Sequence, residues 1–481
     1  MTTQNFTLRG SVASRASQDR DAKASPSEAP WMLLVVATLQ AALAIAAAVT
    51  VKTESRIAWG YLRPDATARL FLVVTNVIFL GIASYVWGRA RAEPSLRDEV
   101  RRFSRLSTLF MVAANVAVLS NHLIVGWVAL EATTLLAAPL IVREGVPSSR
   151  RASWRYFLFS SVGLGLALLG FACLARSLEM NDHIPTYFID DLSSLVGGPP
   201  NLWRRLGLAF IFLGYGTKLG LAPMYSWLPE TYDEAPPAVT ALLAAVQVNA
   251  ALVGLIRVLQ VYRAGNPELV ATELLVLGLA SMAVSAVSIL ATRNFKRLIA
   301  YASINHAGVI AIGLAIGKSA SYGVVLYVVS NAFIKAILFL TAGNIKAHYG
   351  TKDTRQIAGL IKDLPYSGLF LMIGTFALLG FPPFGSFLGE LIILSGLVRA
   401  KQMFVFVIFC SLIAMTFVAT GRTVFPMLWG EPKATVNWPR QTLLSATPKL
   451  VFLGALVVMG IYMPTAINTV FRTVAASLGA E

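Results

Sequence analysis

A succession of long apolar runs, separated by short polar segments, is the feature of this sequence that most constrains its fold. A helix of about 20 apolar residues crosses the hydrocarbon core of a bilayer, whereas a transmembrane barrel needs strands of alternating residues. Unpaired backbone groups are too costly in lipid, so only a helical bundle fits these runs. The sequence therefore predicts an all-α polytopic transmembrane bundle of about 14 helices, at residues 31–51, 68–88, 106–120, 121–142, 155–176, 205–228, 236–262, 270–292, 298–316, 321–345, 365–381, 384–400, 402–427 and 447–470.

The composition agrees with a membrane protein and excludes several functional classes. Hydrophobic residues make up 56% of the 481 residues and charged residues only 13%, against about a quarter charged in soluble domains. The net charge of +16 comes from short loops, which excludes a nucleic-acid-binding domain. Cys173 and Cys410 lie alone in separate runs, so they form neither a disulfide framework nor a metal or iron–sulfur site. We expect no cofactor in this chain.

The two ends of the chain differ from the rest. Residues 1–30 are polar and nearly free of aromatic side chains, which is typical of a flexible tail. The first apolar run begins late, at Trp31, and is long enough to span, which argues against a cleaved signal peptide. We assign residues 31–104 to N-terminal transmembrane helices and residues 431–481 to a C-terminal loop and transmembrane helix.

The charges of the loops predict the orientation. Four basic loops fall at one end of the predicted bundle, and the loop with Asp190 and Asp191 falls at the other. Since loops rich in lysine and arginine stay in the cytoplasm, the basic end is predicted to be cytoplasmic, in a bacterial inner membrane. The basic residues are Arg89, Arg91, Arg97, Arg101, Arg102, Arg105, Arg143, Arg150, Arg151, Arg155, Arg293, Lys296, Arg297, Lys346, Lys352, Arg355 and Lys362.

Residues 214–237 place an ammonium group, Lys218, in the middle of an apolar run and then interrupt that run. A charge at the centre of a membrane helix costs about 2.5–3.5 kcal/mol, so an intramembrane lysine marks a functional site by default. Freed backbone groups are tolerated at that depth only where they are buried or line a wet cavity. A broken helix beside a buried lysine is typical of a transporter. The predicted helix breaks here are Pro223, Pro229, Pro236 and Pro237.

Glu131 is the acid that can control the charge of this lysine. No other charge lies between His122 and Arg143, so we interpret Glu131 as a buried acid. A carboxylate near a helix end that reaches water is the alternative. Burial favours a neutral lysine, whereas a carboxylate about 4 Å away restores the charge with roughly 4 kcal/mol at an effective dielectric of 20. Moving the acid in and out of contact would load and unload a proton near neutral pH.

The second half of the chain contains a comparable set of residues. Lys335 lies in an apolar run with no other charge, and Glu390 follows an interruption that contains Pro382 and Pro383. We interpret both charged groups as proton-relay residues rather than interfacial side chains. Each half of the chain contains a helix with an ionisable side chain and a helix interrupted by proline. This correspondence predicts two inverted repeats.

Other polar residues allow more than one interpretation. His306 suits a connecting relay because the ordinary pKa of histidine is about 6.5, but a helix-packing histidine is nearly as well supported. Arg257 is interpreted as an anchor at the end of its run, and the loop at 293–297 as a topology signal only. The sequence contains no phosphate-binding loop, dinucleotide fingerprint or nucleophile–base motif.

At these residues the chain resembles a known family: the antiporter-like proton-translocating membrane subunits of respiratory complex I, multisubunit cation/proton antiporters and group 4 hydrogenases. The resemblance covers about residues 105–430. Its last two motifs look most like component F of hydrogenase 4 and formate hydrogenlyase complexes. The motifs stand in the family's order at residues 217–229, 234–236 and 295–303, around Lys335 at 331–345, and at 380–385 with Glu390.

The resemblance implies roles for the buried charges. Many relatives carry a lysine where this chain has Asn249, so the link between the halves would run through water, Gln247 or His306. The corresponding division is a first antiporter-like repeat at 105–262 and a second at 263–430. By this resemblance, Glu131 and Lys218 are the coupled acid–lysine pair of the first half-channel. Lys335 is the central lysine and His306 the connecting histidine. Glu390 is the terminal ionisable residue of the second half-channel.

The residues and the resemblance together support three functional hypotheses. The leading one is a proton-translocating subunit of a redox-driven complex, in which other membrane subunits and a peripheral hydrogenase-like arm carry the electron transfer. The second is a secondary cation/proton antiporter or proton channel that energises a non-redox partner, such as an inorganic-carbon uptake protein. The third is a scaffold that has kept the fold and lost conduction.

Overall fold

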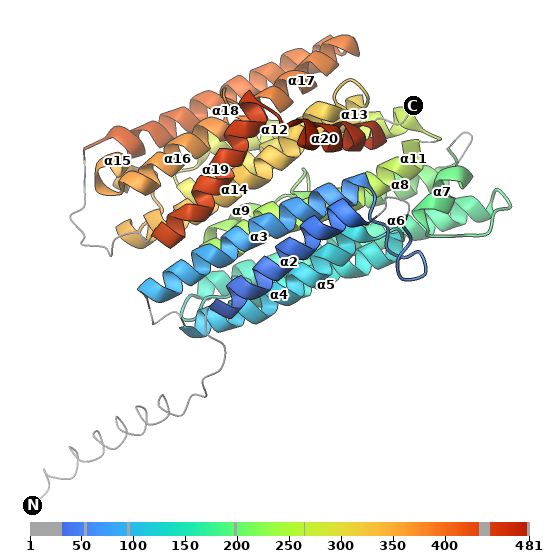
Figure 1. Ribbon diagram of the computed structural model, residues 1–481. Coiled ribbons are helices and arrows are strands. Elements are labelled where there is room, and N and C mark those ends of the chain that lie inside the picture. Colours follow the sequence, from blue (N-terminus) through green and yellow to red (C-terminus); the bar gives the residue numbers. More distant parts are fainter. Residues whose placement is uncertain are drawn as a thin grey trace, which may run out of the picture.

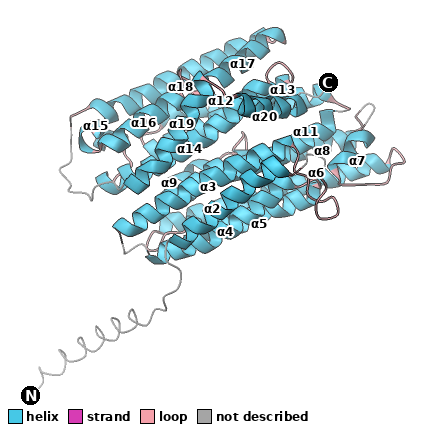
Figure 2. Ribbon diagram, viewed as in Figure 1, coloured by secondary structure: helices cyan, strands magenta, loops and turns pink. Residues whose placement is uncertain are grey.

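The computed structural model describes residues 31–51, 55–93, 97–196, 200–263, 265–431 and 443–478. Its helices lie side by side along one common direction (Figure 1), and the described residues form helices, turns and isolated bridges without a strand (Figure 2). Ten described helices are long and apolar enough to cross a membrane, or eleven if one bent pair counts as a single span. The predicted transmembrane helical bundle is confirmed. The tail expected at 1–30 lies outside the described residues.

Every predicted apolar run contains a helix. The run at 205–228 contains two helices joined by a break, and the run at 447–470 contains two that are bent by 77°. The helices are α2 (Trp31–Thr50), α3 (Ala66–Ala92), α4 (Arg97–Leu119), α5 (Leu123–Ile141), α6 (Pro147–Glu179), α7 (Ile189–Leu195), α8 (Leu202–Leu219), α9 (Trp227–Glu234), α10 (Pro237–Leu242), the π-helix η2 (Leu243–Gln247), α11 (Val248–Arg263), α12 (Pro267–Ala291), α13 (Phe295–Ile316), α14 (Ser321–Tyr349), the short 3-10 helix η3 (Thr354–Gln356), α15 (Leu360–Asp363), α16 (Pro365–Leu378), α17 (Gly385–Arg399), α18 (Met403–Trp429), α19 (Leu443–Ile461) and α20 (Thr465–Leu478).

The centre of the bundle is α14. Its apolar window is 100% buried, and that of the continuous helix Pro237–Arg263 is 94% buried, whereas the outer helices α2 and α18 reach only 22% and 28%. Apolar character alone does not decide this position, because α2 and α18 have mean hydropathies of 2.4 and 2.5, above the 2.0 of α14, and still lie at the outside of the bundle. Lys335 on α14 is 4% exposed and therefore lies at the core of the protein.

Two helices are broken in the same way, one in each half of the chain. The first break joins α8 to α9 and the second joins α16 to α17. Each begins at a glycine with a left-handed backbone, Gly220 at φ +79° and Gly380 at φ +67°, which side chains disfavour. Three residues later each break has a proline after a cis peptide bond, Pro223 and Pro383. The two breaks thus share the same sequence of backbone features, and the division into repeats at 105–262 and 263–430 stays a prediction.

A side chain that follows each break bonds back to the end of the helix before it. The indole N–H of Trp227 donates to the carbonyl oxygen of Thr217 at 2.8 Å. The hydroxyl of Ser386 donates to the carbonyl oxygen of Ala377 at 2.7 Å. Each of these carbonyl oxygens also accepts from the backbone N–H of the glycine in its break, Gly220 or Gly380, at 3.3 Å. The side-chain bond is therefore a second bond to the end of the helix, and it ties the two sides of each break together.

Of the six prolines predicted as helix breaks, four lie between helices, whereas Pro229 and Pro237 lie in the first turns of α9 and α10. Pro223, Pro382 and Pro383 lie between helices, and Pro236 lies between α9 and α10. The prediction that Pro229 and Pro237 break a helix is wrong, because each lies in the first turn of its helix. A first-turn N–H has no partner within its helix, so proline is tolerated there.

The loop at 293–297 does more than set the topology. Lys296 is 1% exposed, and its Nζ donates to the carbonyl oxygens of Asp233 at 2.8 Å and Ala235 at 3.1 Å. These carbonyls belong to the C-terminal end of α9, where helices leave acceptors unpaired. The interpretation of this loop as a topology signal only is therefore wrong. Lys296 fastens the short helix after the first break to α13.

Ion pairs strengthen the same junction. The carboxylate of Asp233 lies 3.1 Å from Nε of Arg297 and 2.7 Å from Nζ of Lys352. Lys352 also lies 3.1 Å from Glu234, which accepts from the hydroxyl of Ser148 at 2.9 Å. The first break is thus held at the basic end of the bundle, meaning the end with Arg143, Arg297 and Lys352, by groups from both halves of the chain.

At the opposite end, Asp65 joins α3 to α11. Its carboxylate caps α3 by accepting from the N–H of Ala68 at 2.8 Å, and it accepts two hydrogen bonds from Arg257, one of them at 2.9 Å. The interpretation of Arg257 as an anchor is confirmed. Burial would raise the pKa of the Asp65 carboxyl, but the charge and hydrogen bonds of Arg257 hold that pKa below its ordinary value of 3.8.

We expect Asp65→Asn to lower the unfolding midpoint of the detergent-solubilised protein at neutral pH. Asparagine can still cap α3, but it leaves the buried guanidinium of Arg257 unpaired, which costs about 3 kcal/mol. Because the folded-state pKa of Asp65 is lowered, this stabilisation exists above about pH 4 and is lost as the pH falls through that pKa. The difference between the unfolding midpoints of Asp65→Asn and wild type should therefore disappear at acidic pH.

Asp353→Asn is the matched control, because the Asp353–Arg355 pair is exposed and such pairs contribute little. Equal midpoints of wild type and Asp65→Asn at neutral pH would contradict the anchoring role of the pair.

Candidate functional site

The first predicted lysine lies at the end of α8, directly before the break. Lys218 is 1% exposed, and its Nζ donates to the hydroxyl of Thr134 on α5 at 2.6 Å. That hydroxyl lies 3.3 Å from a carboxylate oxygen of Glu131, one turn earlier on α5. The described ion pairs do not include Glu131 with Lys218. The two predicted partners are brought together, but a hydroxyl group stands between them.

Glu131 is half-buried and has a second hydroxyl partner. Ser161 on α6 donates to its other carboxylate oxygen at 2.5 Å. A hydroxyl has one proton to donate and two lone pairs, so Thr134 can accept from Lys218 while it donates to Glu131. The arrangement is a hydrogen-bonded line from carboxylate to ammonium, here called the first site and made of Glu131, Thr134, Ser161 and Lys218.

Tyr156 and Gln247 extend the first site towards the centre of the bundle. The ammonium of Lys218 lies 5.0 Å from the ring centroid of Tyr156, a distance at which an aromatic face attracts a cation. The hydroxyl of Tyr156 donates to Oε1 of Gln247 at 3.0 Å, and Nε2 of Gln247 donates to the hydroxyl of Thr133 at 2.9 Å. Gln247 ends the π-helical turn η2, an element often found at functional sites.

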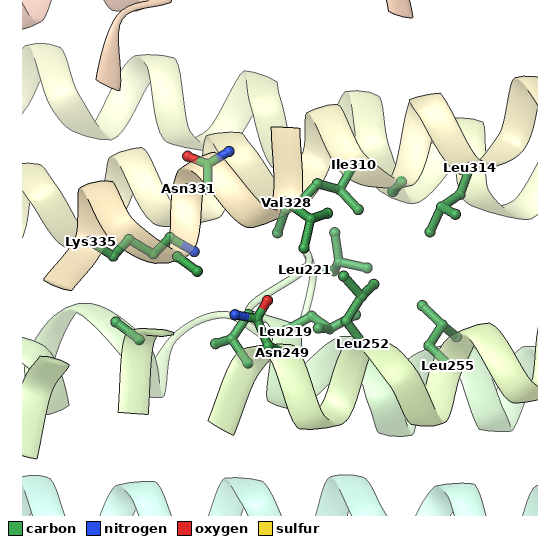
Figure 3. Close-up of a pocket in the computed structure, with 15 residues that line it drawn as sticks. Leu219, Leu221, Asn249, Leu252, Leu255, Ile310, Leu314, Val328, Asn331 and Lys335 are labelled. Carbon is green, nitrogen blue, oxygen red and sulfur yellow. The ribbon is translucent and has the colours of Figure 1, made fainter. Parts of the chain in front are cut away.

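A small cavity beside Gln247 contains the central lysine of the second half. Asn249 and Lys335 line it from two facing helices, α11 and α14, and the side chain of Lys335 extends into it (Figure 3). Its volume is about 20 Å³, and roughly 10–15 Å³ suffices for one water molecule. The amide of Asn249 also donates to the carbonyl oxygen of Ala245 at 2.6 Å. The cavity has polar groups and space for a single bridging water.

His306 and Glu390 lie on either side of the second break. Nε2 of His306 donates to the carbonyl oxygen of Leu378, the last residue of α16, at 3.2 Å. His306 also meets the ring of Tyr327 edge-on at 5.6 Å. The carboxylate of Glu390 lies against Gly380, because a Cβ placed there would come within 2.5 Å of it. The absence of a side chain at Gly380 therefore makes room for the acid.

The sequence did not identify the hydroxyl partners. Thr134 and Ser161 connect Glu131 to its surroundings, and Tyr156 covers Lys218. Thr134 follows Glu131 by three residues, a spacing that places two side chains on one face of a helix. Ser161 and Tyr156 lie on another helix, and nothing in their local sequence indicates which charge they meet.

Two relatives show the range of proteins to which the chain is similar. It is 28% identical to a hydrogenase-4 component F homolog from Methylacidiphilum infernorum over 410 residues, which cover 82% of this chain and 84% of that protein. It is 27% identical to a Na⁺/H⁺ antiporter subunit from Bacillus subtilis over 379 residues, which cover 78% of this chain and 74% of that protein.

Solved structures with the same fold cover nearly the whole chain. One component of the membrane-bound sulfane sulfur reductase, an archaeal respiratory membrane complex, superposes with a TM-score of 0.84 at 22% identity, covering 94% of this chain and 93% of that one. One component of the Mrp complex from Dietzia sp. DQ12-45-1b superposes with a TM-score of 0.81 at 20% identity, covering 93% and 92%.

The family follows from a direct match to the sequence. Residues 120–416 match the model described as NADH:quinone oxidoreductase/Mrp antiporter, TM, and this range contains Glu131, Lys218, Lys335 and Glu390. Because the match spans more than half of the 481 residues, this multi-pass membrane protein belongs to the family of antiporter-like membrane subunits of NADH:quinone oxidoreductases and Mrp antiporters.

Proposed function

We propose that this chain is the proton-translocating membrane subunit of a larger redox-driven complex. The observation that carries the proposal is the hydrogen-bonded line from Glu131 through Thr134 to Lys218. Similarity to a hydrogenase-4 component F homolog supports a hydrogenase-like peripheral arm and further membrane subunits as partners. Electron transfer belongs to those partners. The protein lies in a bacterial inner membrane with its basic end in the cytoplasm.

The first site loads and releases one proton. A proton on Nζ of Lys218 passes to the oxygen of Thr134, and the proton already on that hydroxyl passes to Glu131. The hydroxyl is regenerated, Lys218 becomes neutral and the acid becomes protonated, so charge and atoms balance. The buried ammonium is favoured only while the carboxylate is ionised nearby. A change in the charge or position of Glu131 therefore sets the proton affinity of Lys218.

The link between the halves runs through neutral polar groups. Tyr156 and Gln247 continue from the first site, and a water molecule in the cavity beside Asn249 completes the path to Lys335. The side chain of Asn249 is not protonated at neutral pH, so it cannot carry the proton. The proton is therefore held on Lys335 and not at Asn249. His306 and Glu390, on the two sides of the second break, form the exit half-channel.

A secondary cation/proton antiporter is the second candidate function. Similarity to a subunit of a Na⁺/H⁺ antiporter supports it. Copurification with a tagged copy of this chain separates the two, because a hydrogenase-like subunit with iron–sulfur partners supports the first candidate and contradicts the second. Proton movement that requires a sodium gradient, in a preparation without redox subunits, would support the antiporter and contradict the redox-driven complex.

We expect Lys218→Ala to abolish proton movement without loss of assembly. Alanine removes the group that carries the proton and leaves the helix end intact. The measurement is the change of a pH-sensitive dye inside vesicles that contain the complex copurified with this chain. Lys362→Ala, an exposed lysine on α15, is the matched control and should conduct normally. Wild-type flux in Lys218→Ala would contradict the relay.

We expect Thr134→Val to slow proton movement about tenfold, whereas Thr134→Ser should conduct at nearly the wild-type rate. Valine has a similar shape but removes the hydroxyl between the two charged groups. A hydrogen bond to a charged group contributes about 1.5–3 kcal/mol, and about 1.4 kcal/mol corresponds to a tenfold change in rate. Equal rates for the valine and serine variants, in the same vesicle assay, would show that the hydroxyl is not on the path.

A further inference from the structure

A further buried lysine lies outside the path described above. Lys449 on α19 is 0% exposed, and its Nζ has no hydrogen-bond partner among the described residues. The sequence does not single it out, because it lies near the start of the apolar run 447–470, where a lysine usually reaches the membrane surface. Here the side chain is enclosed instead. A buried ionisable group in a membrane protein is expected to be functional.

Two aromatic rings surround this ammonium group. Nζ of Lys449 lies 5.0 Å from the ring centroid of Phe370 and 5.8 Å from that of Tyr85. Aromatic faces attract a cation without accepting a conventional hydrogen bond from it. The group can therefore carry a charge although no hydrogen bond among the described residues fixes the direction of its Nζ. This differs from Lys296, which two carbonyl oxygens hold in place.

Lys449 lies inside the bundle rather than at its surface. Six residues separate it from the start of α19, which corresponds to a depth of about 9 Å along the helix. Tyr85 lies seven residues before the end of α3, at about the same depth. The two residues meet because α3, α14 and α19 lie side by side in the bundle (Figure 1).

Tyr85 connects Lys449 to a cavity at the basic end of the bundle. Its hydroxyl donates to Oδ1 of Asn344 on α14 at 2.9 Å. Tyr85 also lines a cavity of about 70 Å³, here called the basal cavity, which has room for more than one water molecule. Glu99 and Arg102 on α4, Arg89 on α3 and residues 236–239 of the first half line this cavity.

The charges around the basal cavity suit a path for protons. The guanidinium of Arg89 lies 2.9 Å from the carboxylate of Glu93, which offsets its charge. Arg102 donates to the carbonyl oxygen of Val142 at 2.8 Å, which holds it at the rim. Glu99 supplies a carboxylate in the lining, and a carboxylate near the surface attracts protons.

The basal cavity is also close to the cavity of Lys335. Val239 lines the basal cavity and Ala244 lines the Lys335 cavity, and the two belong to one continuous helix, Pro237–Arg263. Five residues correspond to about 7.5 Å along a helix. The linings of the two cavities are therefore neighbours along this helix.

We propose that Lys449 is an additional proton-carrying lysine, loaded from the basal cavity through Tyr85, on a second access path to Lys335. A water molecule in the cavity gives a proton to the oxygen of Tyr85, whose own proton passes to the neutral amine of Lys449 when that side chain turns towards it. The hydroxyl is regenerated and the amine becomes ammonium. Lys335 lies nine residues from Asn344 on α14, about 13.5 Å along the helix, so water molecules between the helices carry the proton onward from Lys449 to Lys335. This inference rests on the proposed function, because it presumes that Lys335 carries protons.

The test compares variants of the full chain in its copurified complex, reconstituted in vesicles with a pH-sensitive dye. Lys449→Met should lower proton flux at least tenfold, although a methionine fits the apolar surroundings and should not lower the unfolding midpoint. Tyr85→Phe keeps the ring and removes the hydroxyl, and should slow the flux severalfold. Tyr322→Phe is the matched control, since its hydroxyl bonds Asn468 at 3.0 Å, away from both cavities.

The outcomes separate this inference from the proposed function. Wild-type flux in Lys449→Met, together with loss of flux in Lys218→Ala, would overturn the role of Lys449 and leave the proposed function standing. Wild-type flux in Lys218→Ala would contradict the proposed function itself. A loss of flux in Lys449→Met that comes with a lower unfolding midpoint, while Tyr85→Phe conducts normally, would show a packing role and also overturn the inference.

Discussion

The first site holds a buried ammonium group without direct contact with an acid, and the rest of the bundle is arranged around this condition. Lys218 reaches Glu131 only through the hydroxyl of Thr134, and an aromatic ring covers its other side. Direct contact of the carboxylate with the ammonium at about 4 Å would stabilise the charged form of Lys218 by roughly 4 kcal/mol at an effective dielectric of 20. The lysine would then keep its proton. Arg257 illustrates that alternative, since its two hydrogen bonds to Asp65 make an anchor. In the proposed relay, the hydroxyl of Thr134 between the two groups allows the proton to leave Lys218.

The backbone around the breaks serves to position these charges. Each break contains a left-handed glycine, and Trp227 and Ser386 donate hydrogen bonds back across the two breaks. Lys296 then fixes the short helix after the first break. Because irregular backbone in a membrane must be fully bonded, each break is rigid enough to place a charged side chain. The wholly buried α14 brings Lys335 between the two halves.

The helices and most of the buried charges could be predicted from the sequence for one physical reason. Unpaired backbone groups and charged side chains are both costly in a bilayer, so the spans must be helical and a charge within one indicates a function. Lys218 and Lys335 were therefore visible in single apolar runs. The partners of these charges were not, since Ser161 and Tyr156 come from a helix distant in sequence. Lys296 and Lys449 were missed because lysines near run ends usually reach water. Burial at such positions depends on packing, which hydrophobic periodicity does not reveal.

In the proposed function, the two halves of the chain are joined by polar groups and water near Asn249. A map of the protein in lipid discs, at a resolution that reveals single water molecules, tests this most directly. We expect an ordered water in the cavity of about 20 Å³ between Asn249 and Lys335, within hydrogen-bond distance of both side chains. A dry cavity, with the amine of Lys335 turned away from Asn249, would contradict the account.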